Sequence, residues 1–366
     1  MAPDSAHWAN WIDAALSEDT SRQREANRFC DTLLALGRVP FLSWHHLEEL
    51  LSLEDREWAL RRIAFIKSLP MISFIRLPFE QYSPGGVVEI LTAEVLAAYR
   101  GAHDLAAVRD EAKSLLLRMG SGIEAIGEDT WVWDVVRDES LRRQHQSRMI
   151  TALSEFAPFK MDRPFGEVAK GRMRTGSEAA NMFGELHAAV LKEIRGHGDK
   201  RINNPTSMAG EFIDRVKSTK INEDLSVRDF LTIALLAQGI EISEIRDDIL
   251  LSELNELAEF RAKLKIVSTK TGISFDSLKA VDRKLIPSWQ IERALKLHGQ
   301  KRPERKGSDL IDTHLMTLAP YVEEIFVDKR TAEDIRRVCS KNTMISQLIG
   351  KVRKASRYQE LATGTL

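Results

Sequence analysis

Carboxylates stand at the ends of predicted elements in the stretch 307–337, which reads GSDLIDTHLMTLAPYVEEIFVDKRTAEDIRR. Asp309 and Asp312 open an apolar run and are three residues apart, so on a helix their carboxylates share one face. Residues 325–327 form a short run typical of a buried strand, and Asp328 follows it directly. The pattern predicts a helix, a strand and a second helix, with carboxylates at the start of the first helix and at the end of the strand. In open α/β sheets, ligands bind outside the carboxyl ends of the strands.

Two carboxylates near the N-terminus complete the set of candidate site residues. Asp4 precedes an amphipathic stretch, and Ser43 is a predicted N-cap for a helix that carries Glu48 and Glu49. If both chain ends build one sheet, five side chains converge: Asp4, Glu49, Asp309, Asp312 and Asp328. Clustered carboxylates repel one another unless a cation lies between them or their pKa values are raised. Oxygen ligands suit Mg²⁺ or Mn²⁺, which bind a few carboxylates plus substrate phosphates, so this pattern indicates metal-assisted hydrolysis of a phosphodiester.

Composition narrows the class of protein. The chain has 366 residues, of which 43% are hydrophobic and 29% are charged, as in soluble globular proteins. Its 53 basic and 54 acidic residues leave a net charge of −1, which excludes a strongly basic coat and leaves only local basic patches for nucleic acid. Two distant cysteines favour a reducing compartment and exclude a four-cysteine zinc site. No signal peptide and no bilayer-spanning apolar stretch are visible, so we expect a cytoplasmic protein without a membrane partner.

Strand and helix patterns alternate at the two chain ends and give way to helix between them. Strands are predicted near residues 39–42, 71–77 and 325–327, whereas residues 92–282 read almost entirely as helix, including one long helix over 92–119. We therefore predict an α/β domain formed by residues 1–80 and 285–366, with a large all-helical insertion over residues 81–284. The alternatives are two small units that flank a helical domain, or a helical interaction protein in which the carboxylates never meet.

The order of the carboxylates resembles that of the PIN-domain nucleases, a Rossmann-like family. That family has an Asp at the end of its first strand, a Ser-initiated helix with a Glu, a later helix that opens with one or two Asp, and a following strand that ends in Asp. Here DSAHWANWI supplies Asp4, SWHHLEELL supplies Glu49, and SDLIDTHLMTLAPYVEEIFVDKRT supplies Asp312 with Asp309 beside it, then Asp328. Two features depart from the family pattern: only three residues precede the first Asp, and valine rather than threonine precedes the last.

The resemblance covers roughly residues 1–80 and 285–345 and is closest to bacterial members with large insertions. It implies a three-layer α/β/α fold in which the five acids hold one or two Mg²⁺ or Mn²⁺ ions that activate water against a phosphodiester. It implies that Lys329 and Arg330 bind a substrate phosphate and that the substrate is RNA more often than single-stranded DNA. A role as a toxin or in phage defence would fit proteins of this kind.

Other interpretations of the same residues stay open. The acids are also typical helix caps and turn residues. The same fold with a degraded site would serve as a scaffold whose helical insertion binds a protein partner. Assembly of the chain into a homo-oligomer is a further alternative. The basic runs 301–306 and 351–357 are either solvated or bind a nucleic-acid backbone. We interpret four tryptophans as packing residues rather than base-stacking platforms: Trp8, Trp11, Trp131 and Trp133.

Overall fold

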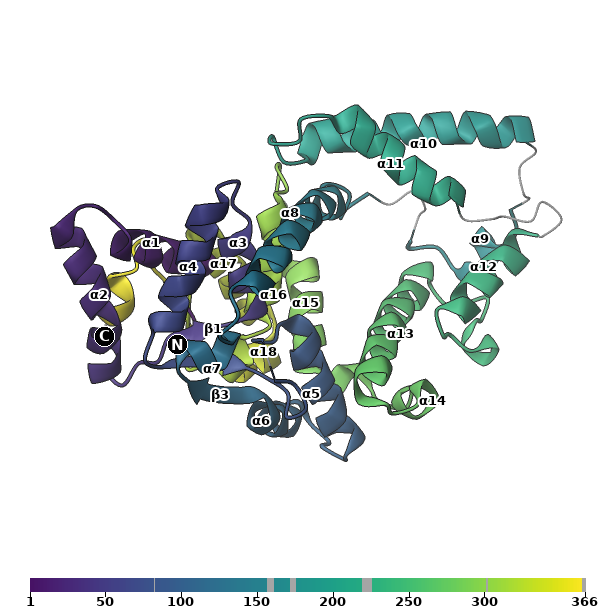
Figure 1. Cartoon of the computed structure of the whole chain (residues 1–366). Coiled ribbons are helices and arrows are strands. Elements are labelled where there is room, and N and C mark those ends of the chain that lie inside the picture. Colours follow the sequence, from purple (N-terminus) through teal and green to yellow (C-terminus); the bar gives the residue numbers. More distant parts are fainter. Residues whose placement is uncertain (82, 157–160, 172–175, 219–225, 301, 364–366) are drawn as a thin grey trace. The chain divides into compact units, whose positions relative to one another are not determined.

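The computed structural model describes residues 1–81, 83–156, 161–171, 176–218, 226–300 and 302–363. The chain divides into two units (Figure 1): unit 1 comprises Met1–His145, Ala280–Lys301 and Ser308–Leu366, and unit 2 comprises Gln146–Lys279 and Arg302–Gly307. Unit 1 therefore extends well beyond the predicted boundary at residue 80. The helices that follow this boundary pack into the cores of unit 1 rather than into a separate insertion.

Among the described residues of unit 1, five short strands are formed. In the first sheet the middle strand pairs in parallel with one neighbour and antiparallel with the other, and in the second sheet both strands are parallel. The strands are β1 (Phe41–Leu42), β2 (Ile72–Ile75) and β3 (Leu117–Gly120), in the order β1-β2-β3, followed by β4 (Glu324–Val327) and β5 (Lys351–Lys354).

The first three residues join the two sheets. The Ala2 N–H donates to the carbonyl of Glu324 and the Ala2 carbonyl accepts from the N–H of Phe326, both at 2.8 Å, which makes a parallel bridge to β4. On the other side, the Met1 carbonyl accepts from the N–H of Phe41 at 2.9 Å. The Met1 nitrogen donates to the Val39 carbonyl at 3.0 Å, so this pairing is parallel as well. The chain start thus lies between β1 and β4, and the parallel strands follow the order β2-β1-(1–3)-β4-β5.

Pro3 limits this first strand to a stub. Proline has no N–H and cannot donate to the carbonyl of Phe41. That carbonyl instead accepts a hydrogen bond from the indole Nε1 of Trp8 at 3.1 Å. The side chain of α1 thus replaces the missing ladder bond, and the backbone turns directly into the helix.

Helices cover both faces of this sheet. Strand side chains alternate between two hydrophobic cores: Leu42 and Phe326 point into one, whereas Phe41, Ile325 and Val327 point into the other. The first core is built mainly from α1 (Ser5–Ala15), α2 (Thr20–Ala35), α3 (Trp44–Leu51), α4 (Arg56–Ser68), α7 (Gly122–Ile126), the start of α8 (Trp131–Ala152) and α19 (Glu360–Thr363). The second is built from α5 (Val87–Tyr99), α6 (Leu105–Leu116), α15 (Pro287–His298), α16 (Gly307–Met316), α17 (Lys329–Lys341) and α18 (Thr343–Leu348).

Unit 2 is helical throughout its named elements. Its two small cores are separate: one joins the end of α8 to α10 and α11, and the other joins α9, α12 and α13. The helices are α9 (Phe165–Val168), α10 (Gly176–His197), α11 (Pro205–Ser218), α12 (Val227–Ala237), α13 (Leu251–Thr271) and α14 (Phe275–Leu278). Across the part of the chain that the structure describes, no helix has the length and apolarity needed to cross a bilayer.

The predicted strands near 39–42, 71–77 and 325–327 are confirmed as β1, β2 and β4. The predicted helix over 92–119 is wrong, because Gly101, with φ of 110°, separates α5 from α6 and the last residues pair with β2 as β3. Strand β5 has the polar sequence KVRK, so no apolar pattern in the sequence predicted it.

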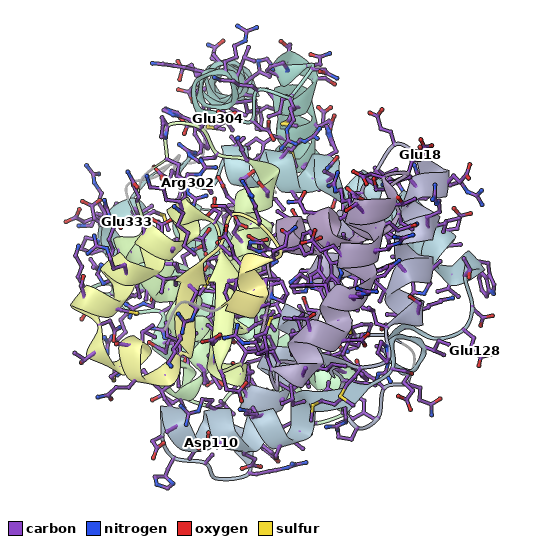
Figure 2. All side chains as sticks on the ribbon, turned by 90° about the vertical axis from the view of Figure 1, so that its left-hand side faces the viewer. Glu18, Asp110, Glu128, Arg302, Glu304 and Glu333 are labelled. Atoms are coloured by element: carbon purple, nitrogen blue, oxygen red, sulfur yellow. The ribbon has the colours of Figure 1, made fainter. Side chains whose placement is uncertain are left out.

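Trp8, Trp11 and Trp133 are buried as expected, but Trp131 is 68% exposed, so its interpretation as a packing residue is wrong. Figure 2 shows charged side chains such as Glu128 extending from the surface of unit 1.

Candidate functional site

Asp4 lies at the carboxyl end of the 1–3 strand and caps α1. Its Oδ1 accepts from the N–H of His7 at 2.8 Å and lies 2.6 Å from the His7 Nδ1. The other ring nitrogen of His7 is 3.2 Å from the carbonyl of Ala355, just beyond β5. Burial lowers the pKa of His7, but the hydrogen bond and the negative charge of Asp4 outweigh burial and raise it. The predicted first acid is therefore paired with a buried histidine.

Glu49 lies close to Asp4, although Glu49 is on α3 and Asp4 precedes α1. Burial raises the pKa of Glu49; the Ser5 hydroxyl opposes this rise, and the negative charge of Asp4 adds to it. Ser5 is 7% exposed, and its buried hydroxyl interacts with the Glu49 carboxylate. We refer to Asp4, Ser5 and Glu49 as the Asp4–Glu49 cluster. It combines two carboxylates with a buried hydroxyl, which is the kind of oxygen-rich set that a divalent cation prefers.

His46 holds the Glu49 helix against the first strand. Ser43 is the N-cap of α3, as predicted, and its N–H donates to the His46 Nδ1 at 2.9 Å. The Nε2 must then carry the proton, and it donates to the Pro3 carbonyl at 2.8 Å. Burial lowers the pKa of His46 to about 4, so the ring is neutral near pH 7. This neutral bridge fixes α3 next to the residue that precedes Asp4.

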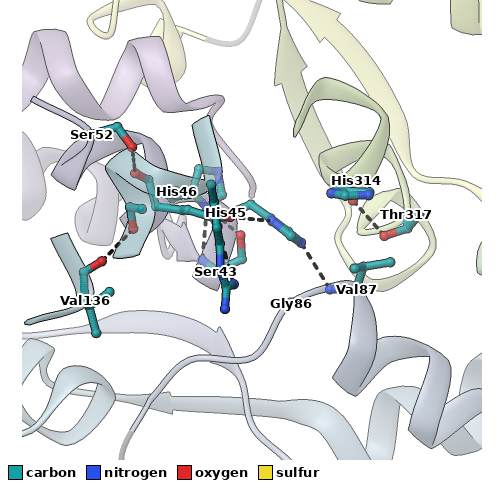
Figure 3. A network of polar contacts seen from close by, with 12 residues as sticks. Ser43, His45, His46, Ser52, Gly86, Val87, Val136, His314 and Thr317 are labelled. Atoms are coloured by element: carbon teal, nitrogen blue, oxygen red, sulfur yellow. Dashed lines mark hydrogen bonds and ion pairs between the residues drawn. The ribbon is translucent and has the colours of Figure 1, made fainter. Parts of the chain in front are cut away.

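His45 connects α3 to α5 and α16. Its Nε2 accepts from the N–H of Val87 at 3.2 Å, and its ring centroid lies 4.8 Å from that of His314 (Figure 3). The Nδ1 is 3.5 Å from a carboxylate oxygen of Glu48. Gly86 makes room for this arrangement, since a Cβ there would lie 2.9 Å from the His45 Nε2. The helix that carries Glu49 and the helix that carries Asp312 are therefore in contact through their histidines.

The face of α16 that meets His45 is not the face that carries its acids. At about 100° per residue, the side chains of Asp312 and Asp309 lie roughly 160° and 140° around the helix from that of His314. Both acids are half-buried. The structure thus brings the predicted acid helix to α3, but the His45–His314 contact does not turn Asp309 or Asp312 toward Glu49.

Asp328 directly follows β4, as the sequence predicted, and its carboxylate serves as an N-cap. Its Oδ1 accepts from the N–H of Thr331 at 2.7 Å, and its Oδ2 is 3.9 Å from the guanidinium of Arg330. The parallel bridge between Ala2 and Ile325 puts Asp4 level with the residue before Asp328 on the neighbouring strand. Lys329 and Arg330 are exposed at the start of α17.

A metal ion would have to be held by few protein ligands. Among the residues that the structure describes, no three histidine, cysteine, aspartate or glutamate side chains lie close enough together to hold one. Mg²⁺ commonly binds through one or two carboxylates and completes its shell with water and substrate phosphate. The Asp4–Glu49 cluster fits that requirement, and the buried Ser5 hydroxyl adds a third oxygen to it. Asp309, Asp312 and Asp328 stay predicted ligands.

Within the basic run 301–306, Arg305 is not available to bind a nucleic-acid backbone. Lys301 lies outside the described residues. Arg305 is buried, and its guanidinium donates to the Ala152 carbonyl at 2.8 Å and to Glu193 at 2.7 Å. In the run 351–357, Arg353 pairs with Glu324 at 2.8 Å. Both arginines therefore have partners within their own unit.

Ser5 and His7, which lie next to Asp4 in the structure, were not among the predicted site residues. A signal was present, since an acid followed three residues later by a side chain that can bond back is the pattern of a capping box. Comparisons with family models, with curated proteins and with solved structures gave no match. The site is therefore interpreted from its own geometry.

Proposed function

We propose that unit 1 is a PIN-like, divalent-metal-dependent nuclease that hydrolyses phosphodiester bonds of RNA. The parallel strand order β2-β1-(1–3)-β4-β5 supports this proposal. The order reverses direction between residues 1–3 and β4, and such a switch point is where open α/β sheets bind ligands. Asp4 and Asp328 follow the two strands on either side of it.

The observation that carries the proposal is the Asp4–Glu49 cluster at this edge. Two carboxylates from separate elements are close enough for the charge of one to raise the pKa of the other. Proteins rarely keep such a pair half-buried without a cation or a bound proton, because like charges in a desolvated place repel strongly. The pair also lies beside the buried Ser5 hydroxyl, which interacts with Glu49.

In this proposal the protein binds and orients the substrate while its carboxylates hold one or two Mg²⁺ or Mn²⁺ ions. Asp4 and Glu49 would hold the first ion, with Asp312, Asp309 and Asp328 as further candidate ligands. A bound ion supplies Lewis-acid stabilisation of the phosphoryl oxygens and lowers the pKa of a coordinated water. Lys329 and Arg330 follow Asp328 and are exposed, so they can reach a substrate phosphate.

A cleavage assay tests the proposal. Labelled single-stranded RNA and single-stranded DNA are incubated with the full chain in Mn²⁺ or Mg²⁺, with EDTA as the control. We expect metal-dependent cleavage of RNA, and a loss of at least about 10-fold in Asp312→Asn, because a ligand carboxylate becomes a neutral amide. Equal cleavage by both proteins, or cleavage by neither, contradicts the catalytic proposal with this set of ligands.

A scaffold with a degraded site is the second candidate, and one contact favours it. The 2.6 Å contact between Asp4 and His7 already gives a partner to the carboxylate that a metal ion needs. A protein of this kind would bind no Mn²⁺ and would cleave neither substrate. Isothermal titration with Mn²⁺ separates the two candidates, since only the nuclease should show a site that Glu49→Gln weakens.

A further inference from the structure

A groove runs between α2 and α19, two helices of unit 1 that lie side by side (Figure 1). Its volume is about 590 Å³, which is in the range of small-molecule sites. Trp11 fixes the α2 wall, because its Nε1 donates to the Ala26 carbonyl at 2.9 Å and its ring meets that of Phe29 edge-on at 5.2 Å. Leu361 fixes the α19 wall, since it is fully buried in the first core. The groove therefore has two firm walls within one unit.

Arg24 and Arg28 supply the positive charge of this groove. They are four residues apart, so their side chains lie about 40° apart on one face of α2 and reach the same space. Both are exposed, and among the described residues neither guanidinium has an ion-pair or hydrogen-bond partner. By contrast, Arg38, Arg56 and Arg62 of the same unit pair with carboxylates. The two groove arginines can therefore donate to an anionic ligand, and a guanidinium binds a phosphate through two parallel hydrogen bonds.

The neighbouring part of the groove is polar but carries the opposite charge. The Gln359 amide donates to the Glu25 carboxylate at 3.3 Å, and both side chains line the groove. Phe29 also lines it and offers an apolar contact. A phosphate is attracted by the arginines and repelled by Glu25, whereas the hydroxyl of a sugar can donate to Glu25. The groove is thus suited to a ligand that is charged at one end and hydroxyl-bearing beside it.

We propose that this groove binds a phosphate monoester of the size of a nucleotide. The phosphate lies between the guanidiniums of Arg24 and Arg28, the sugar hydroxyls donate to Glu25, and the remaining part of the ligand packs on Phe29. The carboxylate beside the arginines disfavours a nucleic-acid strand, which is charged along its whole length. The inference is independent of the proposed nuclease, because no residue of the proposed metal site lines the groove.

Isothermal titration of the full chain with adenosine monophosphate and with ribose phosphate tests this inference. The solution contains EDTA, which removes divalent ions from the proposed metal site, and about 0.15 M salt, which screens unspecific attraction. We expect saturable binding with which inorganic phosphate competes and adenosine does not. Arg24→Gln and Arg28→Gln should each weaken the affinity by at least about 10-fold, because each removes a charged donor to the phosphate.

Arg22 offers a matched control. It is exposed on the same helix, but its side chain points about 160° away from that of Arg24 and does not line the groove. Arg22→Gln removes the same charge and should change the affinity by less than about 2-fold, as expected of a solvated charge outside the site.

Three results would overturn the inference. The first is that neither phosphate monoester binds saturably. The second is an equal loss of affinity in Arg22→Gln and Arg24→Gln, which would reflect net charge alone. The third is Arg24-dependent binding of single-stranded RNA without binding of either monoester, which would make the groove a surface for a nucleic-acid strand. If one arginine variant does not fold, the other decides. A wild type that cleaves no RNA contradicts the proposed function and leaves this inference unaffected.

Discussion

Glu49→Gln is expected to lower the kcat/KM for RNA cleavage by at least about 100-fold, which corresponds to about 2.7 kcal/mol of transition-state stabilisation. The reason is that the amide keeps the shape of the side chain but cannot hold a divalent cation as a carboxylate does. The same substitution should leave unit 1 as stable as the wild type at pH 7, or more stable. Burial raises the pKa of Glu49, so the folded state desolvates a charge that glutamine does not have.

The neighbouring residue offers a matched control. Glu48 is also half-buried on α3, but its carboxylate has partners of its own, 3.5 Å from His45 and 3.8 Å from Arg143. Glu48→Gln should therefore change kcat/KM by less than about 3-fold. Equal losses in both variants, or a Glu49→Gln protein destabilised by more than about 1 kcal/mol, would show that the effect is structural.

Stability can be followed in unit 1 alone because of where the tryptophans lie. All seven fall within its segments, so tryptophan fluorescence in a urea titration reports unit 1 and not unit 2. The seven are Trp8, Trp11, Trp44, Trp58, Trp131, Trp133 and Trp289. This separation matters because a chain with two units need not unfold in one step.

The sequence predicted the elements that carry Asp328 and Glu49 because local patterns determine them. An apolar run followed by an acid predicts a strand and a helix cap, and Ser43 before an amphipathic stretch predicts the start of α3. The strand at residues 1–3 was harder to predict, since three residues carry no periodicity. Its existence depends on partners that lie 38 or more residues away, such as Val39 and Glu324.

The unit boundary and the environment of the acids depend on long-range packing, which a single sequence does not encode locally. Nothing in the sequence near Asp4 indicates that Glu49, 45 residues further along the chain, will lie beside Ser5. The basic run 301–306 has the composition of a solvated loop, yet Arg305 is buried because the carbonyl of Ala152 and the carboxylate of Glu193 converge on it. Composition predicts exposure on average, and specific partners override it.

Two buried groups should give the stability of unit 1 opposing responses to pH. Glu94 is fully buried on α5 and accepts from the Ser288 N–H at 3.0 Å, and from the hydroxyls of Ser288 and Tyr321, each at 2.5 Å. Burial raises its pKa to about 7 despite these three donors. The folded state therefore holds this proton more tightly than the unfolded state does. The contribution is complete below about pH 4.5 and is lost as the pH rises toward 7.

His46 acts in the opposite direction. Burial lowers its pKa to about 4, so the folded state resists protonation that the unfolded state accepts. Its contribution is complete above about pH 6.5 and is lost as the pH falls toward 4. At about 1.4 kcal/mol per pKa unit, each group changes the free energy of unfolding by about 3 kcal/mol over nearly the same pH range. The two contributions nearly cancel in the wild type.

Single substitutions should separate these contributions. Glu94→Gln removes the acid, so the unfolding free energy of unit 1 should rise by about 3 kcal/mol from pH 4 to 6.5. His46→Gln removes the base, so the same quantity should fall by about 3 kcal/mol from pH 4.5 to 7. Glu49 and His7, whose pKa values are also raised, add to the fall in both variants and in the wild type. If the unfolding free energies of the three proteins depend on pH in the same way, neither buried group has a different pKa in the folded and unfolded states. The hydrogen bonds from Ser288 and Tyr321 would then offset the effect of burial on the pKa of Glu94 completely.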